Sequence, residues 1–484
     1  MKARAVHGVM TVGMRGVAIR VVGFAGNVAL ARLLVPEQFG VLALGFTFVV
    51  FANFVTDGGI GAQLIRARTT PSRRQFEAIV ALQLGLATAI VVLTAAIGVP
   101  IGTTGAVAAI MACSLPIDAL RAPAALMAER RLDYGALVRA EVVEIIAYNL
   151  VAIGAVVLGA GVWGVAGAVV VRALVGTGLI VATLEPHLVR PRWSWATVRP
   201  LLGFGLRFQS VNLISLVRDQ GLIVVTGAIA GLTTLGYWSL AYRIVQVVLL
   251  VLESLRRVSY PAIARLIAAQ EELGPTLQRA LRVTAIMTGA AVAVLIGAAP
   301  ALIPFVFGER WEPAVSAVAW SAAGLMIAGP MSTICAGLLS ARGRLDQVLR
   351  VTVTHTVVWF AVSAPLLPGL GVKALGIGWC VSASIDLVLL TRYARRQVRL
   401  DVVAGMARPV VAVAAGAATG WWVAQTVPGA LVASAAALAT SIAIYLLTLA
   451  ILAPHDLREA FAIVRRGMRR APAGGARRVV AERP

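Results

Sequence analysis

The chain has 484 residues, of which 60% are hydrophobic and 13% are charged, and its formal net charge at pH 7 is +22. Soluble globular proteins are much less apolar, so this composition excludes them and indicates an integral membrane protein. The basic residues are dispersed between apolar runs, which argues against nucleic acid as a partner.

Membrane-spanning helices are the first elements that the sequence predicts. A helix needs about 20 mostly apolar residues to cross a bilayer, and fourteen stretches meet this condition, so we expect an all-α integral membrane protein. The apolar start is not a cleavable signal, because Arg15 and Arg20 interrupt it. The predicted spans are centred near residues 24, 52, 89, 116, 149, 174, 214, 245, 294, 326, 359, 383, 415 and 441.

Arginine is concentrated on one side of these spans. The connections after every second span are rich in it, from Arg66 after the second span to Arg408 after the twelfth, whereas the other connections carry Arg310 and Lys373. Short basic loops stay in the cytoplasm, so we expect a multi-pass membrane protein with both termini cytoplasmic. The basic segment 454–484 is expected to be a disordered cytoplasmic tail that lies on anionic lipid.

Cysteine, histidine and glycine give no catalytic or metal-binding pattern. The cysteines lie singly in apolar runs, and the four histidines have no ligand spacing. The stretch DGGIGAQ (57–63) lacks the preceding strand of a nucleotide-binding loop, and we interpret it as flexibility at a helix end. We therefore expect neither an enzyme, nor a metal site, nor a cofactor.

Eight arginines fall inside the predicted spans, where a charge at the bilayer centre costs about 2.5–3.5 kcal/mol. Three have structural explanations: Arg121 can pair with Asp118, Arg172 can reach Glu144, and Arg32 can extend to the outer surface. The others are Arg15 and Arg20 on the first span, Arg207 and Arg218 on the seventh, and Arg243 on the eighth.

Arg207 and Arg218 are close to three helical turns apart, so both are predicted to point the same way. Asp219 lies one step round the helix and cannot neutralise these two arginines and Arg243 together. We interpret the arrangement as a water-filled cavity that prefers anions, with Arg218 the deepest of its arginines. A purely structural buried network is the alternative.

The first twelve spans are predicted to be two copies of one unit, as in many transporters. An offset of 196 residues places Gly40 on Gly236 and Asp57 on Glu253. The expected organisation is an N-terminal lobe at 1–186, a C-terminal lobe at 187–404, two further spans at 405–453 and the tail at 454–484.

Several stretches together carry a resemblance to a known family. They resemble the polysaccharide transporters, the Wzx-type oligosaccharide flippases of the multidrug/oligosaccharidyl-lipid/polysaccharide exporter superfamily. The turn at 35–40 departs from the family pattern at Val35, where Thr is usual, and at Gln38, where Asp or Glu is common. The stretches are ARLLVPEQFGVLAL (31–44), VTDGGIGAQLIR (55–66), GVWGVAGAVVVRALV (161–175), LLGFGLRFQSVNLISLVRDQGLIVVTGAIAGLTTLGYWSLAYRI (201–244), SYPAIARL (259–266) and FGERWEPAV (307–315).

The resemblance implies two six-helix lobes that form a V-shaped cavity, plus two extra C-terminal helices. It also implies movement of a polyprenyl-pyrophosphate-linked oligosaccharide from the inner to the outer leaflet of the bacterial inner membrane, for lipopolysaccharide, exopolysaccharide or capsule. Arginine suits this substrate, because its planar fork donates paired hydrogen bonds to phosphate oxygens. Asn27, Gln209 and Asn212 can bond sugar hydroxyls, or instead join one span to another. The expected substrate-binding residues are Arg218, Arg207, Arg20, Arg243, Arg15, Asn212, Gln209 and Asn27.

Relatives of this kind use a cation gradient, which makes Asp219, Asp57 and Glu253 candidates for carrying H+ or Na+; a counter-ion role is the alternative. Expected partners are the lipid-linked oligosaccharide, the membrane, and polysaccharide polymerase or export machinery.

Three rival functions stay open. A multidrug exporter of the same superfamily would need an acidic cavity for cationic drugs. A flippase for the peptidoglycan precursor would handle a similar anion. A membrane polysaccharide polymerase or ligase would need larger outer loops than GVPIGTTG or TVPGA.

Overall fold

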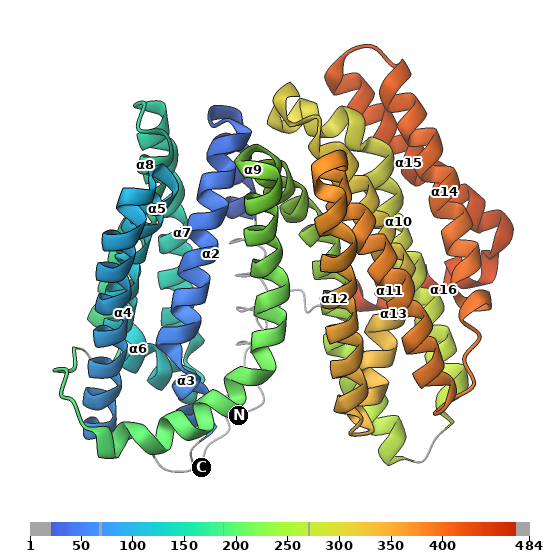
Figure 1. Cartoon of the computed structure of the whole chain (residues 1–484). Helices are drawn as coiled ribbons and strands as arrows, with labels where there is room; N and C mark the ends of the chain where they lie inside the picture. Colours follow the sequence, from blue (N-terminus) through green and yellow to red (C-terminus); the bar gives the residue numbers. More distant parts are fainter. Residues whose placement is uncertain (1–20, 67–69, 187, 270–271, 471–484) are drawn as a thin grey trace, which may run out of the picture. The chain divides into compact units, whose positions relative to one another are not determined.

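The computed structural model describes residues 21–66, 70–186, 188–269 and 272–470, and inside some helices it describes the backbone without the side chains. These residues form α-helices, one 3-10 turn and connecting loops (Figure 1). In the first half of the chain the helices are Val21–Leu33, α2 (Pro36–Asp57), α3 (Ile60–Arg66), α4 (Arg73–Ile101), α5 (Thr103–Ala112), α6 (Ser114–Arg130), α7 (Tyr134–Val157), α8 (Gly161–Thr183) and α9 (Trp195–Ala268). In the second half they are α10 (Leu273–Phe307), η1 (Glu309–Trp311), α11 (Ala314–Ala341), α12 (Leu345–Leu370), α13 (Lys373–Arg395), α14 (Val402–Thr426), α15 (Ala430–Leu452) and α16 (Pro454–Arg470).

Twelve helical stretches of the described chain are long and apolar enough to cross a membrane. The predicted all-α membrane protein is therefore confirmed. The first predicted span falls on the apolar helix Val21–Leu33, whose chain neighbours before residue 21 lie outside the described residues. The seventh and eighth fall on α9, where Leu213–Leu249 forms one continuous candidate. The total of fourteen spans thus stays a prediction.

Gly231 divides α9 into two helical stretches. Its φ of 80° and ψ of 174° are not helical, and a positive φ of this kind is available to glycine because it has no Cβ. The turn lies between the predicted seventh and eighth spans, as a helical hairpin requires.

Local signals explain where α2 begins and ends. Pro36 occupies its first turn, where a missing N–H does no harm. The side chain of Gln38 accepts a hydrogen bond from the Val35 N–H at 3.1 Å, so this departure from the family pattern still caps the helix. The helix ends at Asp57, and the next residue, Gly58, has a left-handed φ of 55°. Within the DGGIGAQ stretch, Gly58 and Gly59 therefore form a defined turn between α2 and α3.

The chain divides into two compact units, which we describe separately. The first runs to Arg243 and includes Ile303–Ala317 and Trp359–Leu375, and the second comprises Ile244–Leu302, Val318–Val358 and the chain from Gly376 on. In the first unit α7 lies beside α8, and in the second α14 lies beside α15 (Figure 1). The predicted repeat-based lobes and the V-shaped cavity stay predictions.

Within the first unit, the start of α2 crosses the second stretch of α9 at two reciprocal points. A Cβ on Gly40 would lie under 3.0 Å from the backbone of Leu232, and a Cβ on Gly236 would collide in the same way with the backbone of Pro36. Leu232 follows Pro36 by the same 196 residues that separate Gly236 from Gly40. The contact therefore has the pseudo-twofold reciprocity that the proposed repeat requires.

The expectation of a disordered tail is wrong for residues 454–470, which form α16. Asp456 and Ala460 are buried on one face of this helix. Asp456 pairs with Arg282 of α10 at 3.5 Å, and Glu459 pairs with Arg279 of the same helix. The sequence analysis considered only the arginines of this segment, and the partners of its acids on α10 lie more than 170 residues away. Residues 471–484 lie outside the described chain.

Candidate substrate-binding site

The predicted site residues are concentrated on α9. Gln209, Arg218 and Asp219 lie before its turn at Gly231, and Arg243 lies after it. Several predicted residues cannot be placed further, because Arg15 and Arg20 lie outside the described residues and so do the side chains of Arg207, Asn212 and Glu253. The roles of these residues stay predictions.

Arg218 and Asp219 form a half-exposed ion pair. The Arg218 Nε donates to the Asp219 Oδ1 at 2.7 Å, and the two side chains are 28% and 32% exposed. The next residue, Gln220, accepts a hydrogen bond from the Thr47 hydroxyl of α2 at 2.9 Å. This bond fixes α9 to α2 directly beside the pair.

Arg243 is held by a neutral group. One of its terminal nitrogens donates to the Asn27 Oδ1 of the helix Val21–Leu33. None of the ion pairs in the described part of the chain includes Arg243. The amide orients the guanidinium but leaves its charge available to an anion.

The two arginines lie at similar depths. Arg218 is 13 residues before Gly231 and Arg243 is 12 residues after it. At about 1.5 Å per residue, both are roughly 18–20 Å along the helix from the turn, well inside a hydrocarbon core of about 30 Å. The two distances differ by one residue, and the prediction that Arg218 is the deepest arginine stays a prediction. Two guanidinium groups and one carboxylate thus lie at similar distances along α9 from the turn, and we call this region the α9 level.

Asp57 and Gln209 belong to a different level. The Gln209 Nε2 donates to the carbonyl of Phe54 at 3.1 Å and to the Asp57 Oδ2 at 3.5 Å. Gln209 is nine residues from Arg218, about 14 Å along the helix. The buried amide therefore bridges α9 to α2, which favours the alternative that it joins two helices over a contact with sugar.

Asp57 also lines a cavity in the first unit. The cavity has a volume of about 340 Å³, and Gln83 of α4 and Glu129 of α6 line it together with apolar side chains such as Phe76. Both carboxylates are on exposed residues. The cavity is acidic and separate from the two arginines, so it is not suited to a pyrophosphate.

The arginines expected to be structural form a balanced network. The predicted pairs are confirmed, with 3.0 Å between Arg121 and Asp118 and 3.7 Å between Arg172 and Glu144. A further ion pair between Arg121 and Glu144 joins them and was not predicted. Two arginines and two acids alternate, so this network leaves no positive charge for an anion.

Arg32 contacts the end of another helix. It is exposed and donates to the carbonyls of Phe305 and Val306 in the last turn of α10, and its extension to the outer surface stays a prediction. These carbonyls have no partner within their own helix. Trp311 lies next to this contact in the chain, is fully buried, and donates its Nε1–H to the Ala31 carbonyl at 2.9 Å. These hydrogen bonds thus join the FGERWEPAV stretch (307–315) and the end of α10 to the ARLLVPEQFG stretch (31–40).

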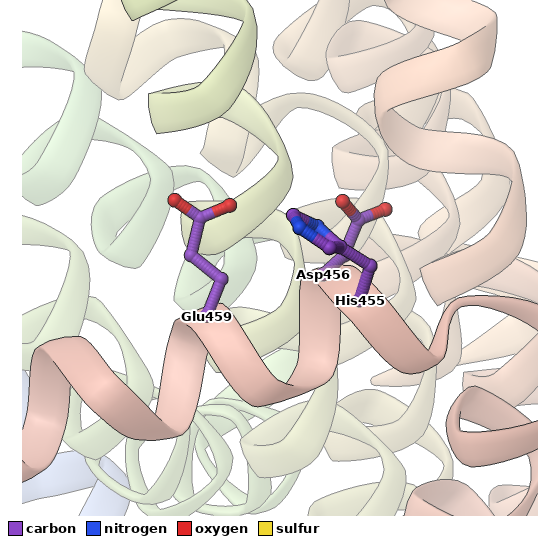
Figure 2. Close-up of side chains that lie close together, drawn as sticks. All are labelled: His455, Asp456 and Glu459. Atoms are coloured by element: carbon purple, nitrogen blue, oxygen red, sulfur yellow. The ribbon is translucent and has the colours of Figure 1, made fainter.

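A cluster of His455, Asp456 and Glu459 on α16 has the spacing of metal ligands (Figure 2). The carboxylates already contact arginines, since Asp456 lies 3.5 Å from Arg282 and 3.9 Å from Arg408. A metal ion would have to displace these cations. We interpret the cluster as the anchor of α16.

The comparison with known families decides the identity of the chain. A family model described as "Polysaccharide biosynthesis protein" matches residues 29–316, which is more than half of the sequence. The chain belongs to this family. The match includes both the α2 crossing and the α9 arginines, and it confirms the resemblance found in the sequence.

Two curated relatives agree with the family. The lipopolysaccharide biosynthesis protein WzxC of Escherichia coli (strain K12) is 23% identical over 407 residues, which cover 80% of each chain. The succinoglycan biosynthesis transport protein ExoT of Rhizobium meliloti (strain 1021) is 25% identical over 308 residues, covering 61% of this chain and 60% of that one. The chain is a Wzx-like transport protein of polysaccharide biosynthesis.

Solved structures show the same fold. The lipid II flippase MurJ in an inward closed conformation matches with a TM-score of 0.70 at 11% identity, covering 92% of this chain and 98% of that one. An inward-facing multidrug resistance transporter of the MATE family matches with a TM-score of 0.59 at 15% identity, covering 78% and 98%. At these identities the likeness concerns the fold alone.

Proposed function

We propose that this protein moves a polyprenyl-pyrophosphate-linked oligosaccharide from the inner to the outer leaflet of the bacterial inner membrane, with both termini cytoplasmic. Arg218 and Arg243 would bind the pyrophosphate. The supporting observation is the excess of positive charge at the α9 level, where Arg218 pairs with Asp219 and Arg243 is held by the neutral Asn27. Family membership supports the substrate class.

The chemistry of the pair suits a carrier. A guanidinium donates short, charge-assisted hydrogen bonds to phosphate oxygens. Asp219 holds Arg218 in place through a hydrogen bond of 2.7 Å. The same carboxylate then competes with the phosphate for Arg218, which keeps binding weak enough for release into the other leaflet.

The rival functions receive less support. The α9 level carries excess positive charge, which repels the cationic drugs of a multidrug exporter. The fold shared with MurJ does not select the peptidoglycan precursor, because the identity is 11%. A polymerase or ligase is not favoured, since the family and the relatives are named for polysaccharide biosynthesis and transport.

The test is a deletion strain analysed by mass spectrometry of its polyprenyl lipids. We expect a pyrophosphate-linked oligosaccharide to accumulate and surface polysaccharide to fall, and we expect the natural gene to restore both. Accumulation of a peptide-bearing lipid would assign the peptidoglycan precursor instead. An unchanged lipid pool with greater sensitivity to toxic cations would assign drug export.

A further inference from the structure

A large cavity lies in the second unit, where several helices begin or end. It has a volume of about 1120 Å³, and its walls come from the start of α10, the turn after α11, the end of α13, the connection after α13 and the start of α14. Cavities of about 300–1,000 Å³ already hold drug-sized ligands. This cavity therefore has room for more than a small ion.

Arginine dominates the charged lining of the cavity. Four arginines and two acids belong to the described residues that line it, so positive charge is in excess at pH 7. Such an excess in a concave site attracts anions. The charged residues are Arg282, Arg342, Arg395, Arg399, Glu272 and Asp401.

Three of the four arginines are not neutralised by an ion pair. Among the described residues, the salt bridges include Arg282 but none of the other three arginines of the lining. Arg342 instead donates to the neutral side-chain amide of Gln397 at 2.9 Å. The carboxylate of Asp401 is engaged elsewhere, because its Oδ1 accepts from the Ala404 N–H at 2.9 Å and caps α14. The charge of these arginines therefore stays available to an anion.

Arg282 adds a donor that lacks an acceptor. Its Nη1 lies 3.5 Å from Asp456 of α16, whereas its Nε is buried and has no hydrogen-bond partner among the residues that the structure describes. Buried donors normally have acceptors, and a missing acceptor costs free energy. An oxygen of an anion bound in the cavity can supply it.

The walls of the cavity are already joined to one another. Gln278 of α10 makes two hydrogen bonds with the backbone of Asp401: its Nε2 donates to the carbonyl at 2.8 Å, and its Oε1 accepts from the N–H at 2.9 Å. The bond between Arg342 and Gln397 ties the same connection to the end of α11. An anion can therefore bind without first ordering these walls, which favours affinity.

The position of the cavity favours a lipid as the source of the anion. α10 has 35 residues and is about 52 Å long, so it exceeds a hydrocarbon core of about 30 Å and can extend into the headgroup region. Ala404 of α14 lines the cavity. The same helix face carries Val403, Val410 and Val411, all exposed. A lipid whose headgroup fills the cavity can therefore lay its acyl chains on this face of α14.

We propose that the cavity binds the phosphate headgroup of an anionic phospholipid. Arg282, Arg395 and Arg399 donate to its phosphate oxygens, because a guanidinium matches a phosphate with paired, charge-assisted hydrogen bonds. Basic pockets between membrane helices bind anionic headgroups in this way. The bound lipid joins the ends of α10, α13 and α14. None of the described lining residues belongs to α9, so this site goes beyond the transport function proposed above.

The first test compares two lipids on the natural protein. Native mass spectrometry of the full-length protein in detergent measures the retention of phosphatidylglycerol and of phosphatidylcholine with the same acyl chains. We expect phosphatidylglycerol to bind roughly tenfold more tightly, because its headgroup carries a net negative charge. Equal retention of the two lipids would overturn the proposal, and this comparison needs no variant to fold.

The second test assigns the binding to the cavity. Arg395→Gln combined with Arg399→Gln should weaken the binding of phosphatidylglycerol roughly tenfold and leave that of phosphatidylcholine unchanged. The matched control is Arg392→Gln combined with Arg396→Gln, which removes two exposed arginines of the same region that do not line the cavity. We expect the control to bind like the natural protein. Equal weakening in both double variants would show a general effect of surface charge and overturn the site.

Two further ligands distinguish the sources of the phosphate. We expect inorganic phosphate to stabilise the protein against thermal unfolding less than phosphatidylglycerol does, and equal stabilisation would assign a free anion instead. We expect polyprenyl pyrophosphate not to displace phosphatidylglycerol. Displacement that Arg395→Gln with Arg399→Gln abolishes would place the transported lipid in this cavity and overturn a phospholipid site. These measurements involve no flipping, so the lipid site and the proposed transport function can fail independently.

Discussion

Gly40 lies directly against the backbone of Leu232, at a distance that leaves no space for a side chain on Gly40. The mirror contact between Gly236 and Pro36 relates the same two segments after an offset of 196 residues. Two helices of the first unit thus cross with their backbones touching, and small residues are the means by which membrane helices approach so closely.

Substituting Gly40 or Gly236 with Ala should therefore destabilise the first unit. A Cβ at either position meets backbone atoms that cannot move aside, and overpacking of this kind costs about 1–3 kcal/mol. Thermal unfolding in detergent measures the loss. The control is Gly85→Ala in α4, where a Cβ has nothing within 4 Å. Equal unfolding temperatures for Gly40→Ala and the control would contradict the close crossing.

Arg218→Ala should abolish export of surface polysaccharide while the protein remains inserted, because the site loses one of its two guanidinium groups. Arg218→Lys should be partly active, since the point charge remains while the paired donors are lost. Quantified surface polysaccharide in the complemented deletion strain measures both variants. Arg73→Ala, which removes an 80% exposed side chain, serves as control. Normal export by Arg218→Ala would remove this residue from the site.

Gln209→Leu should retain most export. The amide of Gln209 bridges α9 to α2, and an apolar side chain of similar length can fill the same contact. The same assay of surface polysaccharide reports the effect, and immunoblotting of membranes controls for the amount of protein. A loss of export at a normal protein level would contradict this prediction and would indicate that Gln209 contacts the sugar.

Glu144→Gln should destabilise the first unit by about 3 kcal/mol, because it leaves Arg121 and Arg172 without their shared buried carboxylate. Adding Arg172→Met, which removes one of the uncompensated charges, should recover part of the loss. Thermal unfolding of the single and double variants tests this coupling. Glu77→Gln, whose partner Arg73 is largely exposed, should change stability little.

Asp456→Asn combined with Glu459→Gln should release α16 from α10, since both changes remove partners of arginines. Faster cleavage by trypsin within 454–470 measures the release. His455→Gln should leave the cleavage rate unchanged, because the anchor is made by the carboxylates. If added zinc stabilises the natural protein and His455→Gln abolishes this stabilisation, the cluster binds metal and is not only an anchor.

Composition and hydropathy were sufficient to identify a membrane protein and most of its helices, because burial in lipid demands long apolar runs whatever the tertiary arrangement. Local spacing also predicted the Arg121 and Asp118 pair, whose members share one helix face. The motifs at 31–44 and 201–244 pointed to the family, and the family match confirmed it.

Partners on different helices could not be read from local pattern. The Arg121 and Glu144 pair, the anchoring of α16 and the meeting of His355 with Asp386 join residues 23 to 180 positions apart. Such meetings depend on how helices pack, which hydropathy and charge counts do not report. Tertiary structure therefore distinguishes an arginine that is neutralised by a neighbour from one, like Arg243, that is held by a neutral amide.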